Sequence, residues 1–179
     1  IRTTSIEKVI REELGGGVLY RRSNNLALLP TFAWCDVLLK RPPRQISGSL
    51  TNTNSSVEDI TASLLDSDGS YVAVQGPPGT GKTYVGAHVI ANLVKQGWKI
   101  GVVAQSHAVV EHLMNSVAKL DSAIPMAKKG QSEKSRPAYH SEDVAAWASG
   151  MLDRGYLIGG TVWTYSRPDI RMLGLDLIV

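Results

Sequence analysis

A short glycine-rich segment, GPPGTGKT at residues 76–83, constrains the fold of this chain more than any other feature of the sequence. It fits the pattern G-x-x-x-x-G-K-[ST], in which a tight loop joins a buried strand to a helix. Residues 71–75 (YVAVQ) form an apolar, β-branched run typical of a buried strand. Residues 82–96 have the spacing of a helix, which Gly97 would end. These neighbours predict a strand, loop and helix unit, and with it an α/β fold.

The same alternation continues toward the C-terminus. Further strands are predicted at residues 98–105 (WKIGVVAQ), 155–163 (GYLIGGTVW) and 175–179 (LDLIV), and further helices at residues 106–120 and 142–152. Parallel strands need long crossover connections, which are usually helical. We therefore expect a three-layer α/β fold, with a parallel sheet and helices on both of its faces.

The part of the chain before this alternation has a different composition. Residues 40–56 (KRPPRQISGSLTNTNSS) are rich in Pro, Ser, Thr and Asn, which is typical of a loop or linker. Ser55 and Glu58 then fit a capping box that would begin a helix. We predict an N-terminal connecting or accessory segment over residues 1–50 and an α/β domain over residues 51–179.

The glycine-rich loop has the residue types that are required to bind a nucleoside triphosphate. Its glycines let the backbone come close to phosphate oxygens, and its N–H groups point at the anion from the positive end of the helix. Lys82 would reach the β- and γ-phosphates and is the candidate catalytic residue, and the Thr83 hydroxyl would ligate Mg²⁺. Tyr84 could pack near the nucleotide or belong to the core. The sequence thus predicts a P-loop NTPase whose candidate nucleotide-binding residues are Gly76, Pro77, Pro78, Gly79, Thr80, Gly81, Lys82, Thr83 and Tyr84.

Two later segments narrow the class of NTPase. The loop, its helix and then KIGVVAQSHAVVEHLM resemble the first RecA-like domain of superfamily 1 helicases, in the branch of the nonsense-mediated-decay and Okazaki-fragment helicases. That branch has the motif A-P-[ST]-N-x-A-V-[DE]-x-L, where Gln105 here replaces Pro and His107 replaces Asn. The resemblance implies that Ser106 and His107 contact the backbone of single-stranded nucleic acid. LIGGTVWTYSR, at residues 157–167, resembles a second family motif and gives Thr161 the same role.

The resemblance implies a function for the intact protein. It would be a helicase or translocase that uses ATP and Mg²⁺ to move 5′→3′ on single-stranded nucleic acid, with DNA favoured over RNA. The whole run resembles most closely the bacterial proteins that join a RecB-like nuclease to such a helicase. The partners implied are therefore a single strand, a second RecA-like domain and a RecB-like nuclease domain.

The same resemblance exposes two departures. The strand at residues 175–179 has the form of the strand that leads into the Walker B acids, and the chain stops where those acids would begin. The domain is therefore expected to be incomplete, and residues 1–179 to bind ATP but hydrolyse it very slowly. The family's adenine-reading Gln has no counterpart between Ile46 and Val74, and Gln45 lies too far back. An unfolding-type AAA+ ATPase and a nucleotide-binding module without turnover remain alternatives.

Composition excludes other classes. With 43% hydrophobic and 20% charged residues the chain is of globular type, and the net charge of +3 permits a polyanionic partner. Cys35 is the only cysteine, which excludes an internal disulfide and favours a cytoplasmic location, where it would be a small buried side chain. No apolar run is long enough to span a bilayer. The spacing of His107, Glu111 and His112 does not match a zinc-protease helix.

Two groups of side chains allow two interpretations each. The basic residues of the polar segment could line a nucleic-acid path, but a solvated loop is favoured for them: Lys128, Lys129, Lys134 and Arg136. Trp163 and Tyr165 could stack on bases, but packing is the more common role of large aromatic residues after a strand.

Overall fold

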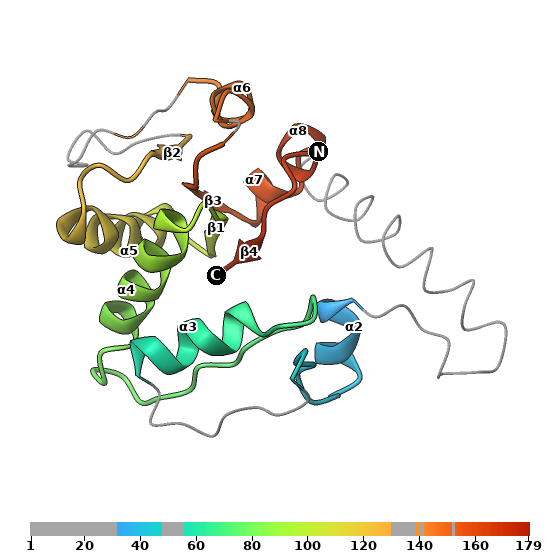
Figure 1. Ribbon diagram of the computed structural model, residues 1–179. Helices are drawn as coiled ribbons and strands as arrows, with labels where there is room; N and C mark the ends of the chain where they lie inside the picture. Colours follow the sequence, from blue (N-terminus) through green and yellow to red (C-terminus); the bar gives the residue numbers. More distant parts are fainter. Residues whose placement is uncertain (1–31, 48–55, 130–138, 140–141, 152) are drawn as a thin grey trace, which may run out of the picture. The chain divides into compact units, whose positions relative to one another are not determined.

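The computed structural model describes residues 32–47, 56–129, 139, 142–151 and 153–179 (Figure 1). Contacts divide the chain into two compact units, residues 1–75 and residues 76–179, and each is described by itself. The predicted domain boundary at residue 50 stays a prediction. Within the described ranges, none of the helices combines the length and apolarity needed to cross a bilayer.

The second unit is built on a four-stranded, all-parallel sheet with the order β2-β3-β1-β4. Its strands are β1 (Lys99–Ala104), β2 (Met126–Lys128), β3 (Tyr156–Thr161) and β4 (Leu177–Ile178). All six residues of β3, one of the two central strands, are buried, as expected of a strand covered on both faces. Three of the four strands lie where the apolar runs predicted them.

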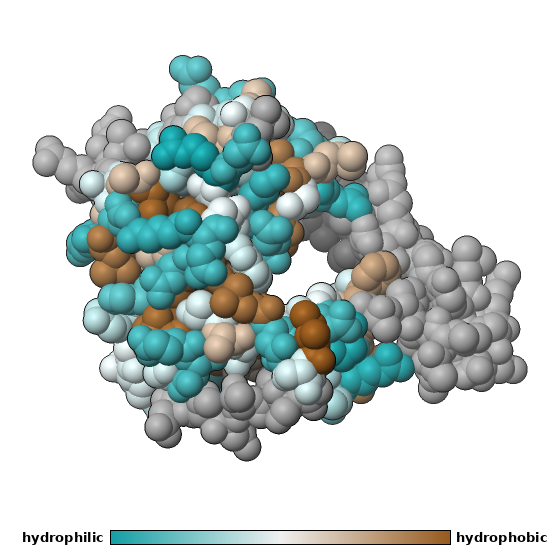
Figure 2. Space-filling model, viewed as in Figure 1, coloured by the Kyte–Doolittle hydropathy of each residue, from teal (hydrophilic) through white to brown (hydrophobic). Residues whose placement is uncertain are grey.

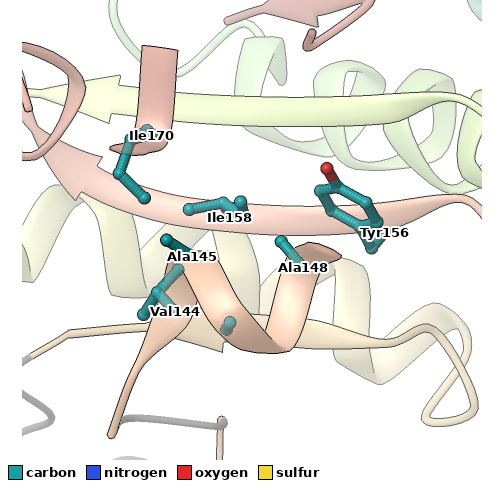
Figure 3. Close-up of a cluster of buried hydrophobic side chains, with 7 residues drawn as sticks. Val144, Ala145, Ala148, Tyr156, Ile158 and Ile170 are labelled. Carbon is teal, nitrogen blue, oxygen red and sulfur yellow. The ribbon is translucent and has the colours of Figure 1, made fainter. Parts of the chain in front are cut away.

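Helices cover both faces of this sheet, which confirms the three-layer α/β prediction. One face carries α4 (Lys82–Lys95) and α5 (His107–Leu120), which pack against each other and against β1. The other face carries α6 (Val144–Ser149), α7 (Val162–Tyr165) and α8 (Pro168–Arg171). Figure 3 shows the buried cluster on this second face, where α6 lies against β3. The members of the cluster are Ala127, Val144, Ala145, Ala148, Tyr156, Ile158 and Ile170.

Local sequence explains the ends of the two long helices. Gly97, with φ of 94°, ends α4: its N–H bonds the Val94 carbonyl and the Trp98 N–H bonds the Leu93 carbonyl. This pair of bonds is a Schellman motif, which turns the chain directly into β1. Ser106 begins α5, because its hydroxyl accepts a hydrogen bond from the Val109 N–H.

Three sequence predictions need correction. Residues 71–75 form no strand: they are partly exposed, and no described strand pairs with them. A β-branched apolar run is a strand only where another strand satisfies its backbone groups. The segment from residue 127, predicted as a polar loop, instead begins inside β2. The N-cap of α3 (Val57–Leu65) is Ser56, whose hydroxyl accepts from the Asp59 N–H, rather than Ser55, which lies outside the described residues.

In the described part of the first unit, a buried carboxylate joins α2 to later residues. Asp36, in α2 (Ala33–Leu38), accepts from Arg44 Nε at 3.0 Å and from Ser70 Oγ at 3.2 Å. Gln45 and Ser67 also form an antiparallel bridge. Part of the segment predicted as a linker is therefore fastened to the residues after α3. Cys35 is buried beside Asp36, in agreement with its predicted packing role.

Candidate nucleotide and nucleic-acid site

The phosphate loop, residues 76–83, is shaped by its glycines. Gly79 and Gly81 have φ of 83° and 80°, a conformation that side chains disfavour, and Gly81 is the N-cap of α4. Gly76 lies so close to the Thr80 hydroxyl that an added Cβ would be 2.8 Å from it. The Thr80 hydroxyl donates to the Pro77 carbonyl at 2.8 Å and braces the loop from within. The loop therefore has the tight, glycine-dependent backbone that close approach to phosphate requires.

Lys82 lies across this loop. Its ammonium group donates to the Gly76 carbonyl at 2.5 Å and to the Pro77 carbonyl at 2.6 Å, and the residue is exposed to solvent. Both of these partners are neutral, so an anionic triphosphate would compete with them effectively for the charge. The structure thus places the candidate catalytic lysine at the mouth of the loop.

The next two residues face solvent in the first turn of α4. Thr83 is exposed, and none of the described contacts uses its hydroxyl, so it fits the role of a single Mg²⁺ ligand beside nucleotide phosphates. Within the described ranges no cluster of three His, Cys, Asp or Glu side chains could hold a metal ion by itself. Tyr84 is 65% exposed, and its ring contacts that of His88 at a tilt of 46° with centroids 4.1 Å apart, so it does not belong to the core.

The direction of α4 places the phosphate loop at the carboxyl edge of the sheet. The helix runs from the loop to Lys95, and β1 begins a few residues later at Lys99, so the helix and strand run in opposite directions. A helix of this length spans about 21 Å, close to the length of a six-residue strand. The start of α4 therefore lies near the end of β1, where ligands of open α/β sheets bind.

Both predicted nucleic-acid segments reach the same edge. Ala104 at the end of β1 is in register with Thr161 at the end of β3, because the two strands pair in parallel from residue 99 onward. Ser106 and His107 follow Ala104 directly; Ser106 caps α5 and His107 is exposed. Two sequence motifs that lie more than fifty residues apart thus converge at one place.

Thr161 has an unusual environment. It is only 9% exposed and precedes α7 as its N-cap, yet its side chain makes no capping bond. Within the described residues its hydroxyl has no hydrogen-bond partner. A buried hydroxyl without a partner is costly, and a bound ligand at this edge would remove that cost.

Lys128 corrects the prediction of a solvated basic loop. It ends β2 with 0% exposure, and its ammonium group pairs with Glu111 of α5 at 2.9 Å. Lys129 is exposed as predicted, whereas Lys134 and Arg136 lie outside the described residues. Burial with an acidic partner excludes Lys128 from a path that contacts nucleic acid.

A tyrosine continues this buried network. Tyr139 donates a hydrogen bond to Asn115 Oδ1 of α5. Burial, assisted by the nearby charge of Glu111, raises the pKa of Tyr139 to about 12. The hydrogen bond therefore attaches Tyr139 to the middle of α5. Sequence reasoning missed it because the partners are far apart in the chain; the only signal was the apolar run that precedes Lys128.

Tyr165 has the packing role that was predicted for it. Its hydroxyl lies 2.6 Å from the Ile158 carbonyl and 3.1 Å from the Val102 carbonyl, between two strands. Burial raises its pKa. Trp163, two residues earlier, is instead 40% exposed.

Comparison with protein-family models matches residues 52–145 to a family described as an AAA domain. The match covers just over half of the chain and includes the phosphate loop, α4, β1, α5 and β2. No curated protein and no solved structure matches the chain significantly.

Proposed function

Because the chain belongs to this AAA domain family, a P-loop ATPase family of the superfamily 1 helicase type, we propose that it is the ATP-binding part of a helicase or translocase. The intact protein couples ATP hydrolysis to movement on a single strand, with DNA as the preferred substrate. A second RecA-like domain, and a nuclease domain of the RecB-like type, are its proposed partners.

One observation supports this proposal most directly. The pairing of Ala104 with Thr161 places Ser106, His107 and Thr161 at the edge of the sheet that also holds the phosphate loop. A nucleotide-binding module without a second ligand has no need for a buried, unpartnered hydroxyl at this position. A strand of phosphates along this edge would accept a hydrogen bond from Thr161 and lie near the positive end of α5.

The residues of the phosphate loop have separate tasks in this function. The backbone N–H groups of residues 79–83 surround the phosphates, and the dipole of α4 stabilises their charge. Lys82 exchanges its two carbonyl partners for phosphate oxygens and stabilises the charge that develops during hydrolysis. Mg²⁺, when bound with the nucleotide, neutralises phosphate charge, and Thr83 would be its ligand from this chain.

Binding of nucleotide and nucleic acid can influence each other through the packed core. α4 packs on α5, so the helix that follows the phosphate loop contacts the helix that begins at His107. A shift of α4 on nucleotide binding would therefore reach the nucleic-acid edge through side-chain contacts alone.

The experiment that tests the proposal measures binding of both ligands. We expect residues 1–179 to bind a fluorescent ATP analogue with Mg²⁺ and, separately, a labelled oligo-dT strand. Thr161→Val should weaken binding of the strand at least about tenfold, since a hydrogen bond to a charged group is worth about 1.5–3 kcal/mol, and should leave ATP affinity unchanged. Its stability should stay the same or rise, because the substitution removes a buried hydroxyl for which the described part of the chain supplies no hydrogen-bond partner.

A matched control is Thr61→Val in α3, another buried threonine, whose hydroxyl donates to the Val57 carbonyl at 2.7 Å. This variant should lose stability and keep its affinity for the strand. ATPase activity of the intact protein that oligo-dT does not stimulate, or equal strand affinity of Thr161→Val and the parent, would contradict the proposal.

A further inference from the structure

The one-turn helix α7 exposes apolar surface at the carboxyl edge of the sheet. Val162 is 52% exposed and Trp163 is 40% exposed, and both directly follow Thr161. Val109, in the first turn of α5, is 58% exposed and follows the other predicted nucleic-acid segment. Single exposed apolar residues need no explanation, but these three flank one polar edge. The exposed part of the Trp163 ring is therefore accessible to a ligand.

The support beneath Trp163 is rigid. Tyr165 anchors α7 to the carbonyls of Val102 and Ile158, which belong to the two central strands. An added Cβ on Gly160 would lie 2.5 Å from Thr164, so α7 sits directly on the backbone of β3. Ser166 Oγ also donates to the Trp163 carbonyl at 2.9 Å. The indole is therefore presented by a fixed turn, which lowers the entropic cost of binding.

Two other aromatic side chains of this unit, Trp147 and Tyr165, show what packing looks like here. Trp147 of α6 meets Tyr156 edge to face, with ring centroids 5.7 Å apart, beside the buried cluster. Tyr165 is partly buried, and its hydroxyl is hydrogen bonded to the Ile158 carbonyl. Trp163 has neither feature: within the described residues its ring has no stacking partner. It differs from both in being half exposed at an edge that carries the two nucleic-acid segments.

We infer that Trp163 is a stacking platform for an unpaired nucleobase of the bound strand. The inference rests on the proposed function and deepens it by assigning the base contact. Thr161 and Ser106 would hold phosphates, which carry no sequence information, and the indole would take the π-face of one base. Every base has such a face, so the contact tolerates any sequence, as a translocating protein requires. Duplex DNA cannot use it, because its bases are already stacked.

The test uses residues 1–179 with oligo-dT and with a strand of equal length whose sites are abasic. Both strands carry the same phosphates, so they separate stacking from charge. Trp163→Ala should weaken oligo-dT binding about tenfold and leave binding of the abasic strand unchanged. Trp163→Phe should keep most of the affinity, and Trp163→Leu, which is apolar without a π-face, should behave like the alanine variant. Affinity for the ATP analogue should be the same in all of them.

Intrinsic fluorescence supplies a second readout. Stacking on a base quenches tryptophan emission, so oligo-dT should quench the parent and fail to quench Trp163→Phe. Trp98→Phe is the matched control: Trp98 is also half-buried but precedes β1 at the opposite edge, so this variant should keep the quenching. This measurement does not depend on how stable the alanine variant is.

The outcomes distinguish the inference from the proposed function. The stacking role is wrong if the parent and Trp163→Leu bind oligo-dT with equal affinity. It is also wrong if the parent binds oligo-dT and the abasic strand with equal affinity. In both cases the helicase proposal is unaffected. If the parent binds neither oligo-dT nor the abasic strand, the proposed function itself is overturned. Loss of quenching in Trp163→Phe, together with a tenfold loss in Trp163→Ala for oligo-dT alone, supports the inference.

Discussion

Two lysines on the carboxyl side of the sheet have opposite environments. Lys82 is exposed and donates to two neutral carbonyls of its own loop, whereas Lys128 is fully buried and pairs with the carboxylate of Glu111. A charge held by neutral partners in solvent can be transferred to an incoming anion at little cost. A charge buried against a carboxylate cannot leave it without a large desolvation penalty. The comparison separates a lysine available for ligand binding from one committed to the fold.

The largest expected effect comes from breaking the buried pair. Lys128→Met removes the buried cation that pairs with the Glu111 carboxylate, and we expect a loss of about 3–5 kcal/mol in the free energy of unfolding. Denaturant unfolding followed by circular dichroism would measure it. The double variant Lys128→Met, Glu111→Met removes both charges and should recover most of the loss. If the single variant is as stable as the parent, Lys128 is not committed to the fold in the way its burial indicates.

The exposed lysine should show the reverse pattern. Lys82→Ala should weaken ATP binding at least tenfold, because a charge-assisted hydrogen bond contributes about 1.5–3 kcal/mol. Its stability should change by less than about 0.5 kcal/mol, as at other exposed sites. Titration with a fluorescent ATP analogue and thermal unfolding of the same sample would test both halves. Lys95→Ala, an exposed lysine at the far end of the same helix, is the control and should bind ATP normally.

Tyr139 tests how far the buried network extends. Tyr139→Phe removes the hydrogen bond to Asn115 and should cost about 1 kcal/mol of stability. Because the pKa of Tyr139 is raised to about 12, its folded-state contribution is complete below pH 10 and is lost as the pH rises through 12. Between pH 9 and about 12, the free energy of unfolding should therefore fall more steeply with pH in the parent than in Tyr139→Phe. Parallel curves would show that the phenol is not part of the network.

The smallest effect is expected at an exposed ion pair, which is the counterpart of the buried pair formed by Lys128. Lys95 lies 3.0 Å from Asp121, and both side chains are partly exposed. The pKa of Asp121 is lowered first by the Ala123 N–H and then by Lys95. Lys95→Ala should therefore raise this pKa only part of the way, as an NMR titration of the carboxyl would show. The stabilisation from Asp121 is present above the pKa it has in the unfolded chain and is lost as the pH falls through the lower, folded value.

Much of the fold could be predicted because it depends on local patterns. The β-branched runs around Val102 and Ile158, and the helical spacing of Val110, Met114 and Val117, identify buried faces without any knowledge of partners. The run at residues 71–75 has the same pattern, yet it forms no strand, since strand formation also depends on a neighbour that pairs with it. Local composition indicates which segments can enter a sheet but not which do.

The candidate site also has one part that local sequence predicts and another part that depends on the tertiary fold. The phosphate loop is one continuous segment, so its residues could be assigned from their order alone. The proximity of Ser106 and Thr161 was implied only by a family resemblance, and it is the register of two strands that brings them together. The burial of Lys128 could not be predicted, because it depends on Glu111 seventeen positions earlier and on the path of β2 between them. The exposure of Trp163 likewise depends on how Tyr165 turns the chain.

The two glycines at the end of β3 have a consequence for how this protein can change over evolutionary time. An added Cβ on Gly159 would lie 2.2 Å from Met114 Sδ on one face, and one on Gly160 would lie 2.5 Å from Thr164 on the other. The backbone is the only spacer between α5 and α7 at this point. A side chain at Gly159 would require Met114 of α5 to move, and one at Gly160 would require Thr164 of α7 to move, and both helices carry part of the proposed nucleic-acid edge. A change at each glycine would therefore affect a different face of the sheet, so the pair limits which side chains both packed helices can tolerate here.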